Sequence, residues 1–262
     1  MEYTTILFDV RENVAHITLN RPDAANSINV SVASELMHAA THCDETPEIR
    51  AVVISGAGRM FCSGGDLKEM GAQDKHLPQH IKEITTYLHP AISRLIRMDA
   101  PVVAAVHGSA AGAGMSLACA CDIVIATEDS RFTMGYTRIG LTPDGSATYF
   151  LPRIVGLKRA LELTLTNRVL SAQEALEWGI VTSVVPGVEL LTHAQTLAIQ
   201  LAAGPTKALG TAKRLLHSGW VETLETQMEN ESQAIADMAR TADSIEGITA
   251  FLEKRTAKFK GK

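Results

Sequence analysis

The sequence predicts an α/β domain followed by a largely helical C-terminal region. Short β-rich runs alternate with stretches of helical apolar spacing, and glycine-rich turns follow two of these runs, but the alternation stops after Asp144. Strands and helices that alternate at this rhythm pair in parallel through right-handed crossovers. We therefore expect an α/β core with the functional site in residues 1–200 and a helical region in residues 201–262.

Composition and charge limit the classes of function. The 262 residues carry 24 Lys and Arg against 29 Asp and Glu, a formal net charge of −5. Because no polybasic run accompanies this charge, nucleic acid and anionic membrane surfaces are not expected partners. The hydrophobic fraction of 46% and the charged fraction of 20% are typical of globular proteins, so wholesale disorder is excluded.

The cysteines and the first residues predict a reduced, cytoplasmic protein. The four cysteines are Cys43, Cys62, Cys119 and Cys121. They are too few for a disulfide framework and lack C-x-x-C metal spacing, so we interpret them as small buried side chains and expect no metal. Met1-Glu2-Tyr3-Thr4 does not begin the basic and apolar pattern of a secretory signal.

The N-terminal segments predict a β-hairpin and then alternating helices and strands. Two β-rich runs flank the polar turn Arg11-Glu12-Asn13. Later segments either have apolar side chains at helical spacing or form a short apolar run. The expected elements are strands at 6–10 and 14–19, a helix at 30–42, a strand at 50–55 and a helix at 82–98.

The stretch 101–121 has no formal charge and about the length of a membrane span. However, His107, Ser109 and several glycines interrupt it. A strand at 102–106, a glycine-rich turn and a packed helix at 112–120 explain it better than a membrane span. Short strands are expected to follow at 123–126 and 132–134.

Helical patterns dominate the chain after Asp144. Pro205 predicts a helix start, at the first helical position, and Gly219 predicts a helix end. The expected helices are 148–155, 160–164, 172–178, 190–203, 206–217, 221–239 and 244–254.

Two glycine-rich turns are the strongest chemical signals. Ser63-Gly64-Gly65-Asp66 and Ala111-Gly112-Ala113-Gly114 each follow a strand and precede a helix. Unpaired N–H groups at a helix start attract negative charge, and two such turns that converge would form an oxyanion hole. Neither turn fits a dinucleotide or phosphate-loop motif. Taken alone, each turn is equally well explained by a helix packed closely on a sheet.

Several short motifs occur in a fixed order. They are Leu19-Asn20-Arg21-Pro22, Asn26-Ser27, Phe61-Cys62-Ser63-Gly64-Gly65-Asp66-Leu67, Ala111-Gly112-Ala113-Gly114, Asp122-Ile123 and Gly140-Leu141-Thr142-Pro143-Asp144. Together they resemble the crotonase family, the enoyl-CoA hydratase/isomerase superfamily, over nearly the whole chain. The resemblance implies a spiral of repeated ββα units and a helical C-terminal region that trimerises, giving a homo-trimer or a dimer of trimers. It also implies an acyl-CoA thioester substrate, with coenzyme A as part of the substrate and no separate cofactor.

The resemblance also implies the binding residues. The backbone N–H groups of Gly65 and Ala113 would hold the thioester oxygen, and one such donor is worth ~3 kcal/mol where water is excluded. Phe251 and Lys254 of a neighbouring subunit would lie near the pantetheine and phosphate groups. The coenzyme A residues around the first turn would be Ala25, Ser63, Gly64, Asp66 and Leu67.

The acid and base residues depart from the family's hydratase pattern. Hydratases of the family carry two glutamates, and this sequence has Ser116 and Tyr136 at those places. Without two carboxylates, syn hydration is hard to arrange. Asp144 matches instead the aspartate of several family isomerases and of 4-chlorobenzoyl-CoA dehalogenase, where it moves a proton or attacks a ring carbon. Its structural alternative is to cap the helix that follows.

His89 bears on whether the protein is a dehalogenase or an isomerase. The dehalogenase has a histidine at this alignment position, but Tyr136 replaces its tryptophan and Gly65 replaces a bulky residue, and a scaffold role for His89 stays open. The segment 246–255 resembles ring-opening isomerases such as 1,2-epoxyphenylacetyl-CoA isomerase. We therefore predict an acyl-CoA isomerase with Asp144 as the proton shuttle. The alternatives are an enoyl-CoA hydratase, a 4-chlorobenzoyl-CoA-type dehalogenase and a non-catalytic acyl-CoA-binding scaffold.

Overall fold

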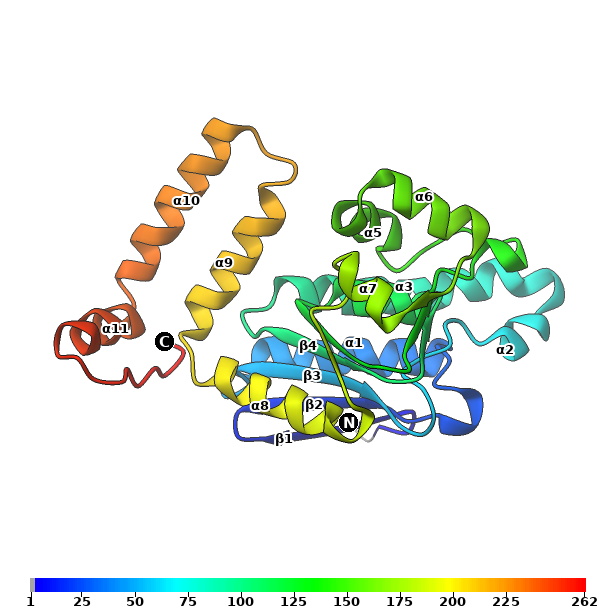
Figure 1. Cartoon of the computed structure of the whole chain (residues 1–262), viewed down its shortest axis with the longest axis horizontal. Helices are drawn as coiled ribbons and strands as arrows, with labels where there is room; N and C mark the ends of the chain where they lie inside the picture. The colour runs from blue at the N-terminus through cyan, green and yellow to red at the C-terminus, as the bar shows by residue number, and fades with distance from the viewer. Residues whose placement is uncertain (1–2) are drawn as a thin grey trace.

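A six-stranded sheet forms the centre of the molecule, and a three-stranded sheet lies beside it (Figure 1). The computed structural model describes residues 3–262. Met1 and Glu2, which open the segment compared above with a secretory signal, lie outside the described residues. The larger sheet has the order β1-β2-β3-β4-β6-β9 and the smaller β5-β7-β8. The strands are β1 Ile6–Arg11, β2 Val14–Leu19, β3 Ala51–Gly56, β4 Val102–Val106, β5 Ser109–Ala111, β6 Ile123–Thr127, β7 Arg131–Thr133, β8 Leu170–Ser171 and β9 Ser183–Val185.

The pairing within the larger sheet confirms the predicted α/β class. β1 and β2 form an antiparallel hairpin, in which Ile6 pairs with Leu19, and every later neighbour in this sheet is parallel. Every residue of β4 is buried, because helices cover both faces of the sheet. Strands covered on both faces are continuous apolar runs, which is why 102–106 is recognisable in the sequence.

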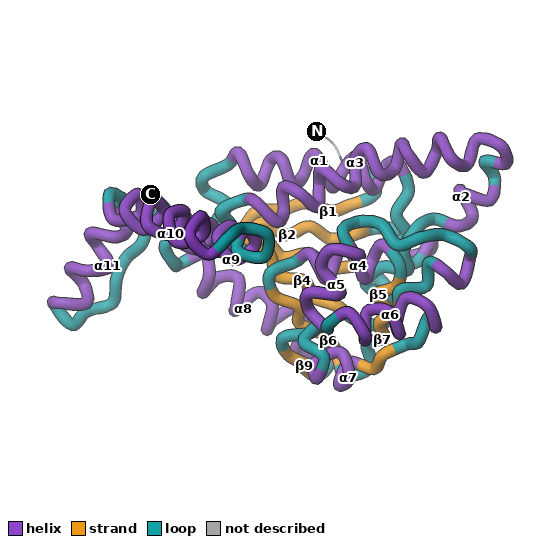
Figure 2. Tube along the Cα trace, turned by 90° about the horizontal axis from the view of Figure 1, so that it is seen from above, coloured by secondary structure: helices purple, strands orange, loops and turns teal. Residues whose placement is uncertain are grey.

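Helices form a layer on each face of the sheet. Figure 2 shows α1 and α3 along one face and α8 on the other. Leu190, Ala194 and Ala198 of α8 pack on Val53 and Val103 of the strands. The helices are α1 Val30–Glu45, α2 Leu67–Gly71, α3 Leu77–Arg97, α4 Ala113–Ala120, α5 Ala147–Val155, α6 Leu157–Thr166, α7 Ala172–Glu177, α8 Leu190–Ala202, α9 Thr206–Ser218, α10 Leu224–Ala239 and α11 Ala242–Leu252.

Several predicted helix starts need correction, among them α6, which begins at Leu157 rather than at 160, and α11, which begins at Ala242 rather than at 244. α3 begins at Leu77 rather than at 82, because Pro78 is tolerated in the first turn of a helix. α10 begins at Leu224 rather than at 221, because the side chain of Thr223 accepts the N–H of Thr226 and caps the helix there. Pro205 is the residue before α9, not its first residue.

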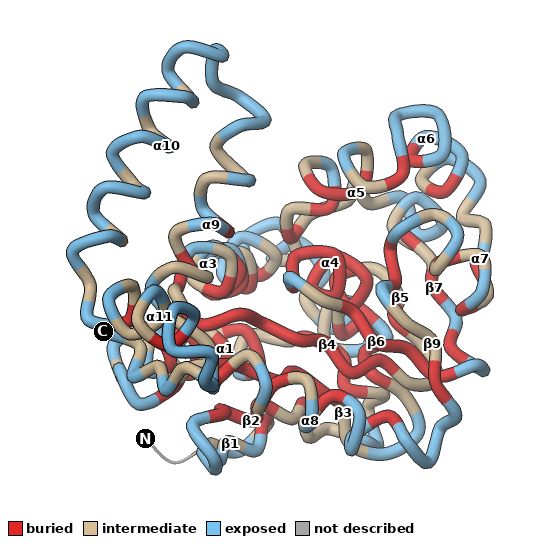
Figure 3. The backbone as a smooth tube through the Cα atoms, turned by 60° about the vertical axis from the view of Figure 1, so that its left-hand side comes forward, coloured by how far each residue is buried: buried red, intermediate tan, exposed pale blue. Residues whose placement is uncertain are grey.

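The uncharged stretch 101–121 forms β4, β5 and α4, which confirms the strand–turn–helix interpretation. All residues of α4 are buried, and Figure 3 shows α4, β4 and β6 together in the core. No helix in residues 3–262 is long and apolar enough to cross a membrane.

The cysteines are buried free thiols, as expected for small core side chains. Burial raises the pKa of Cys43, Cys62 and Cys119 to about 12, so these thiols stay protonated. Among the residues that the structure describes, no group of three His, Cys, Asp or Glu side chains is arranged to hold a metal ion.

The C-terminal helices form an arm anchored at its base. The buried Lys213 of α9 places its Nζ 2.7 Å from both the Asp122 carboxylate and the Leu95 carbonyl of the core. Arg50 reaches the carbonyl of Gly204 over 2.6 Å, just before α9. α10 has no buried residue and lies away from the core (Figure 1, Figure 3). In α10 and α11 the side chains that are both apolar and exposed are Leu224, Met228, Ile235, Ile245, Ile248, Phe251 and Leu252.

Candidate active site

A cavity of about 360 Å³ lies where both glycine-rich turns, the N-terminal half of α3 and the loop before α5 meet. Gly65, Ala113, Tyr136 and Asp144 all line it, so the structure brings together four of the five predicted catalytic residues. Asp144 is the only carboxylate among the described lining residues. Part of the lining is apolar, with Ile84 and Leu88 of α3 almost fully buried.

The two glycine-rich turns are in backbone contact. Gly64 has φ +103°, and a Cβ there would lie 2.9 Å from the carbonyl of Ala111 and 3.4 Å from the amide nitrogen of Ala113. Only glycine permits both that conformation and that approach. The absence of a side chain at Gly64 is therefore what lets the first turn lie against the second.

The amides of Gly65 and Ala113 are donors without acceptors. Within residues 3–262, neither N–H donates a hydrogen bond to another residue, and both residues line the same cavity. Ala113 is also the first residue of α4, where the helix dipole adds positive potential. Two unpaired N–H groups in one apolar cavity can together hold an oxygen that becomes negatively charged.

Asp66 stabilises the first turn through hydrogen bonds within the protein. Its carboxylate accepts the N–H of Glu69 at the start of α2 and the guanidinium of Arg21 at 2.8 Å. Burial would raise the pKa of Asp66, but the hydrogen bonds from Glu69 and Arg21 outweigh it and hold the pKa below its usual value. The predicted coenzyme A role of Asp66 stays a prediction, since its carboxylate is already committed inside the protein.

Asp144 is held by Tyr136. The Tyr136 hydroxyl donates to Asp144 Oδ1 over 2.7 Å, and the Ser116 hydroxyl lies 3.0 Å from the same phenol. Burial, and then the Asp144 charge, raise the pKa of Tyr136, so the phenol remains a donor. The Asp144 carboxylate does not cap α5, because the residue at the cap is Ser146 and no side chain caps that end.

His89 lies beside Asp144, on the side away from the cavity that the two amides line. Its Nε2 is 3.5 Å from Asp144 Oδ2 and accepts the backbone N–H of Gly145 at 3.3 Å. The imidazole lines a different cavity from the one that Asp144 lines. The structure therefore brings His89 to Asp144 without bringing its ring to the cavity of the two amides.

The predicted coenzyme A residues divide into two groups. Ser63, Gly64 and Leu67 line the cavity, and Ala25 is next to them, its carbonyl accepting the N–H of Ser63. Phe251 and Lys254 lie at the end of the arm and do not line the cavity, and 83% of Phe251 is exposed.

Sequence reasoning missed several lining residues. One of them is Arg138, an exposed cation in the short 3₁₀ turn before Gly140. Its charge between two motif segments is the sequence signal that could have indicated a place in the site. Ile81, Ile84 and Leu88 have helical spacing, and that signal predicted the helix but not the direction of its apolar face.

Comparisons with known proteins show which family and fold the chain resembles. The family model described as Enoyl-CoA hydratase/isomerase matches residues 9–262. A Rhodobacter capsulatus protein named "Probable enoyl-CoA hydratase" is 39% identical over 262 residues, which is 100% of both chains. The 1,2-epoxyphenylacetyl-CoA isomerase of Escherichia coli is 39% identical over 258 residues, covering 98% of each. The solved structure of an enoyl-CoA hydratase from Polaromonas sp. JS666 superposes with a TM-score of 0.93 at 34% identity, over 97% of this chain and 99% of that one.

Proposed function

This chain belongs to the enoyl-CoA hydratase/isomerase family, and on that premise we propose that it is an acyl-CoA isomerase that works through a thioester enolate. The N–H groups of Gly65 and Ala113 would hold the thioester oxygen, and Asp144 would move the proton. The observation that carries this choice is the cavity lining, on which Asp144 is the only carboxylate among the described residues.

The proposed reaction is a proton transfer within one substrate. The Asp144 carboxylate takes a proton from the α carbon of a 3-enoyl thioester, and the electron pair moves onto the thioester oxygen between the two amides. The same proton then returns to the γ carbon, which gives the conjugated 2-enoyl thioester. One carboxylate suffices for both steps.

Hydration needs a second acid or base at the site. The positions of the two hydratase glutamates hold Ser116 and Tyr136, whose hydroxyls bond to one another and, through Tyr136, to Asp144. Neither hydroxyl can activate water as a carboxylate does. This supports isomerisation over hydration, although a relative carries a hydratase name. A dehalogenase would use Asp144 as a nucleophile instead, with His89 beside it.

Coenzyme A and the assembly belong to the same proposal. Ser63, Gly64 and Leu67 line the cavity beside the amides, and Phe251 and Lys254 of a neighbouring copy would contact the pantetheine and phosphates. The exposed apolar side chains of the arm support a homo-trimer or a dimer of trimers. Sedimentation should give three or six copies, and Phe251→Asp should lower that number. A monomeric wild type would contradict the assembly.

The buried free thiols support a reducing compartment such as the cytoplasm.

A turnover panel tests the reaction. We expect 3-enoyl-CoA to turn over faster than crotonyl-CoA or 4-chlorobenzoyl-CoA, and Asp144→Asn to lose roughly 10²–10⁴-fold in kcat. Asp23→Asn, an exposed aspartate outside the site, is the matched control. Isomerase activity that survives Asp144→Asn would overturn the proton-shuttle role. Faster crotonyl-CoA turnover would favour the hydratase, and binding without turnover of any thioester would favour the scaffold.

A further inference from the structure

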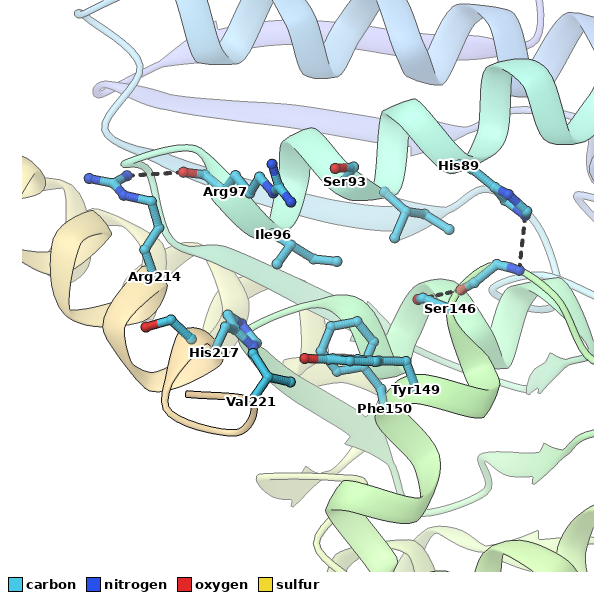
Figure 4. Close-up of a pocket in the computed structure, with 13 residues that line it drawn as sticks. His89, Ser93, Ile96, Arg97, Ser146, Tyr149, Phe150, Arg214, His217 and Val221 are labelled. Carbon is cyan, nitrogen blue, oxygen red and sulfur yellow. Dashed lines mark hydrogen bonds between the residues drawn. The ribbon is translucent and has the colours of Figure 1, made fainter. Parts of the chain in front are cut away.

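A second cavity, of about 680 Å³, lies directly beyond the site along α3. Figure 4 shows it between the C-terminal half of α3, the start of α5 and α9. The N-terminal half of α3 lines the first cavity as far as Leu88, and the next residue, His89, lines the second. The loop before α5 divides in the same way, with Asp144 on the first cavity and Gly145 on the second.

The wall between the two cavities is thin. His89 and Gly145 meet through one hydrogen bond of 3.3 Å, which Figure 4 marks. Gly145 has no side chain, and a Cβ there would lie 3.2 Å from Ser116 Cβ and 3.4 Å from Ile92 Cδ1. Ser116 is bonded to Tyr136 of the site and Ile92 lines the second cavity, so only the space that a side chain at Gly145 would fill lies between them. The His89 side chain is 49% exposed, so little packing holds it in place.

The second cavity suits a hydrocarbon rather than a charged group. Its lining is mostly apolar, through the side chains of Ile92, Ile96, Tyr149, Phe150 and Val221, and it also includes Arg97, Arg214 and His217. The guanidinium of Arg214 is already bound to the Asp99 carboxylate and the Arg97 carbonyl. A cavity of this size and character is in the range that takes small apolar ligands.

We propose that the second cavity receives the distal part of the substrate's acyl chain. The enzyme would then act on thioesters whose hydrocarbon extends well beyond the carbons at Asp144. This inference rests on the proposed function, because Asp144 marks the reacting carbons. A chain that continues from those carbons meets the His89–Gly145 wall first and would pass beside the half-exposed imidazole, which keeps its bond to Gly145.

Binding of saturated acyl-CoA esters tests this without turnover. We expect calorimetry on the wild type to show tighter binding from butyryl-CoA to octanoyl-CoA and dodecanoyl-CoA, by up to about fourfold per methylene that becomes buried. The gain should level off once the chain reaches Val221, which is 66% exposed at the cavity mouth.

Two variants fill the second cavity from different elements, Ile96 in α3 and Val221 in the loop between α9 and α10. Ile96→Trp and Val221→Trp should weaken dodecanoyl-CoA binding by at least tenfold and change butyryl-CoA binding by less than twofold. Val188→Trp is the matched control, because it is the same valine-to-tryptophan substitution at a position next to α8 that is 93% exposed. Val221 is exposed, so its variant should fold even if Ile96→Trp does not.

Several outcomes would overturn the proposal. These are equal affinity of the wild type for all chain lengths, equal loss for short and long chains in both variants, or an altered copy number without a chain-length effect. The last outcome would make the cavity a contact between copies. The Asp144→Asn experiment measures turnover and calorimetry measures binding, so a failed chain-length test leaves the isomerase proposal standing and the two failures can be told apart.

Discussion

At the scale of single residues, the role of His89 depends on which ring nitrogen is already bonded. Nε2 accepts the Gly145 N–H, so in the neutral ring the proton sits on Nδ1. A lone pair engaged by the backbone is not free to take a proton from substrate. His89 is therefore better explained as a positioning residue, which holds the loop that carries Asp144.

Replacing His89 with glutamine distinguishes positioning from base catalysis. We expect His89→Ala to lower kcat about tenfold with little change in KM, because the Asp144 loop loses its anchor. His89→Gln should recover most of kcat, since an amide oxygen can accept the Gly145 N–H. Equal loss in both variants, with a changed acid limb of the pH–rate profile, would instead indicate a general base.

The sequence predicted Asp144, Tyr136 and the two amides as site residues, but not the bond between Tyr136 and Asp144. These residues are eight positions apart, and their contact depends on the 3₁₀ turn at Thr137–Ile139. Short turns of this kind have no periodic pattern that a sequence could reveal. The division of Leu88 and His89 between two cavities is equally invisible, because it depends on where α9 lies.

At the scale of elements, the start of α4 depends on its fit against the first turn. A Cβ at Gly114 would lie 2.5 Å from the Cys62 carbonyl and 2.8 Å from its Sγ. The Cys62 carbonyl also accepts the N–H of Ala111. Close packing of α4 on Cys62 therefore fixes where the Ala113 amide lies.

Gly114→Ala should separate the two turns. We expect about 1–3 kcal/mol of destabilisation, because the added methyl overpacks a buried contact. We also expect at least a tenfold loss of kcat/KM, because the Ala113 N–H moves. Urea unfolding and thioester turnover measure the two effects. Gly71→Ala is the control, since nothing lies within 4 Å of its added methyl. Wild-type turnover by Gly114→Ala would show that the start of α4 can shift freely.

An ion pair with a buried lysine contributes to the attachment of α9. The Lys213 side chain is 8% exposed, and removing its ammonium leaves the Asp122 carboxylate with only the Val102 N–H as a partner among the described residues. We expect Lys213→Met to lower the free energy of unfolding by about 3–5 kcal/mol. Denaturant titration would measure this, with the exposed Lys207→Met as control. A change below 1 kcal/mol would mean that solvent reaches Asp122 and replaces the lysine.

Long elements were predictable, whereas of the shortest strands only β7 was predicted, one residue late. The runs at 14–19, 102–106 and 190–203 have enough residues to show a period or a continuous apolar pattern, and each forms the expected element. β8 has two residues and β9 three, and both pair with strands far away in the sequence. Tertiary pairing creates such strands, so local propensity cannot reveal them.

At the scale of the whole molecule, two shielded histidines make stability depend on pH. Burial lowers the pKa of His16 and His217. Unfolding restores their ordinary pKa, so below about pH 6.5 the unfolded chain binds more protons than the folded one. The fold should therefore lose stability as the pH falls from about 7 to about 5.

Urea midpoints across this range measure the effect. The double variant His16→Gln with His217→Gln should lose at least half of the difference between about pH 7 and about pH 5. His193→Gln, on the exposed side of α8, is the control. An unchanged difference in the double variant would assign the pH dependence to other groups.

The arm shows what a single chain cannot predict by itself. The helices after 205 were predicted from periodicity, yet their apolar side chains, Phe251 among them, remain exposed. Their periodic pattern is the same whether a helix packs on its own core or on another copy. The sequence therefore predicted helices there, and only the family resemblance suggested what they contact.

The groups that hold the thioester oxygen are main-chain atoms, and this has a consequence for engineering. Exchanging the side chain at position 113 cannot delete its amide, so libraries randomised around the turns should retain electrophile activation wherever the backbone path survives. Removing the donor itself requires an atom swap in the peptide bond, such as an ester linkage at Ala113 made by semisynthesis. New chemistries can therefore be screened by varying positions 116, 136 and 144 on an unchanged amide pair.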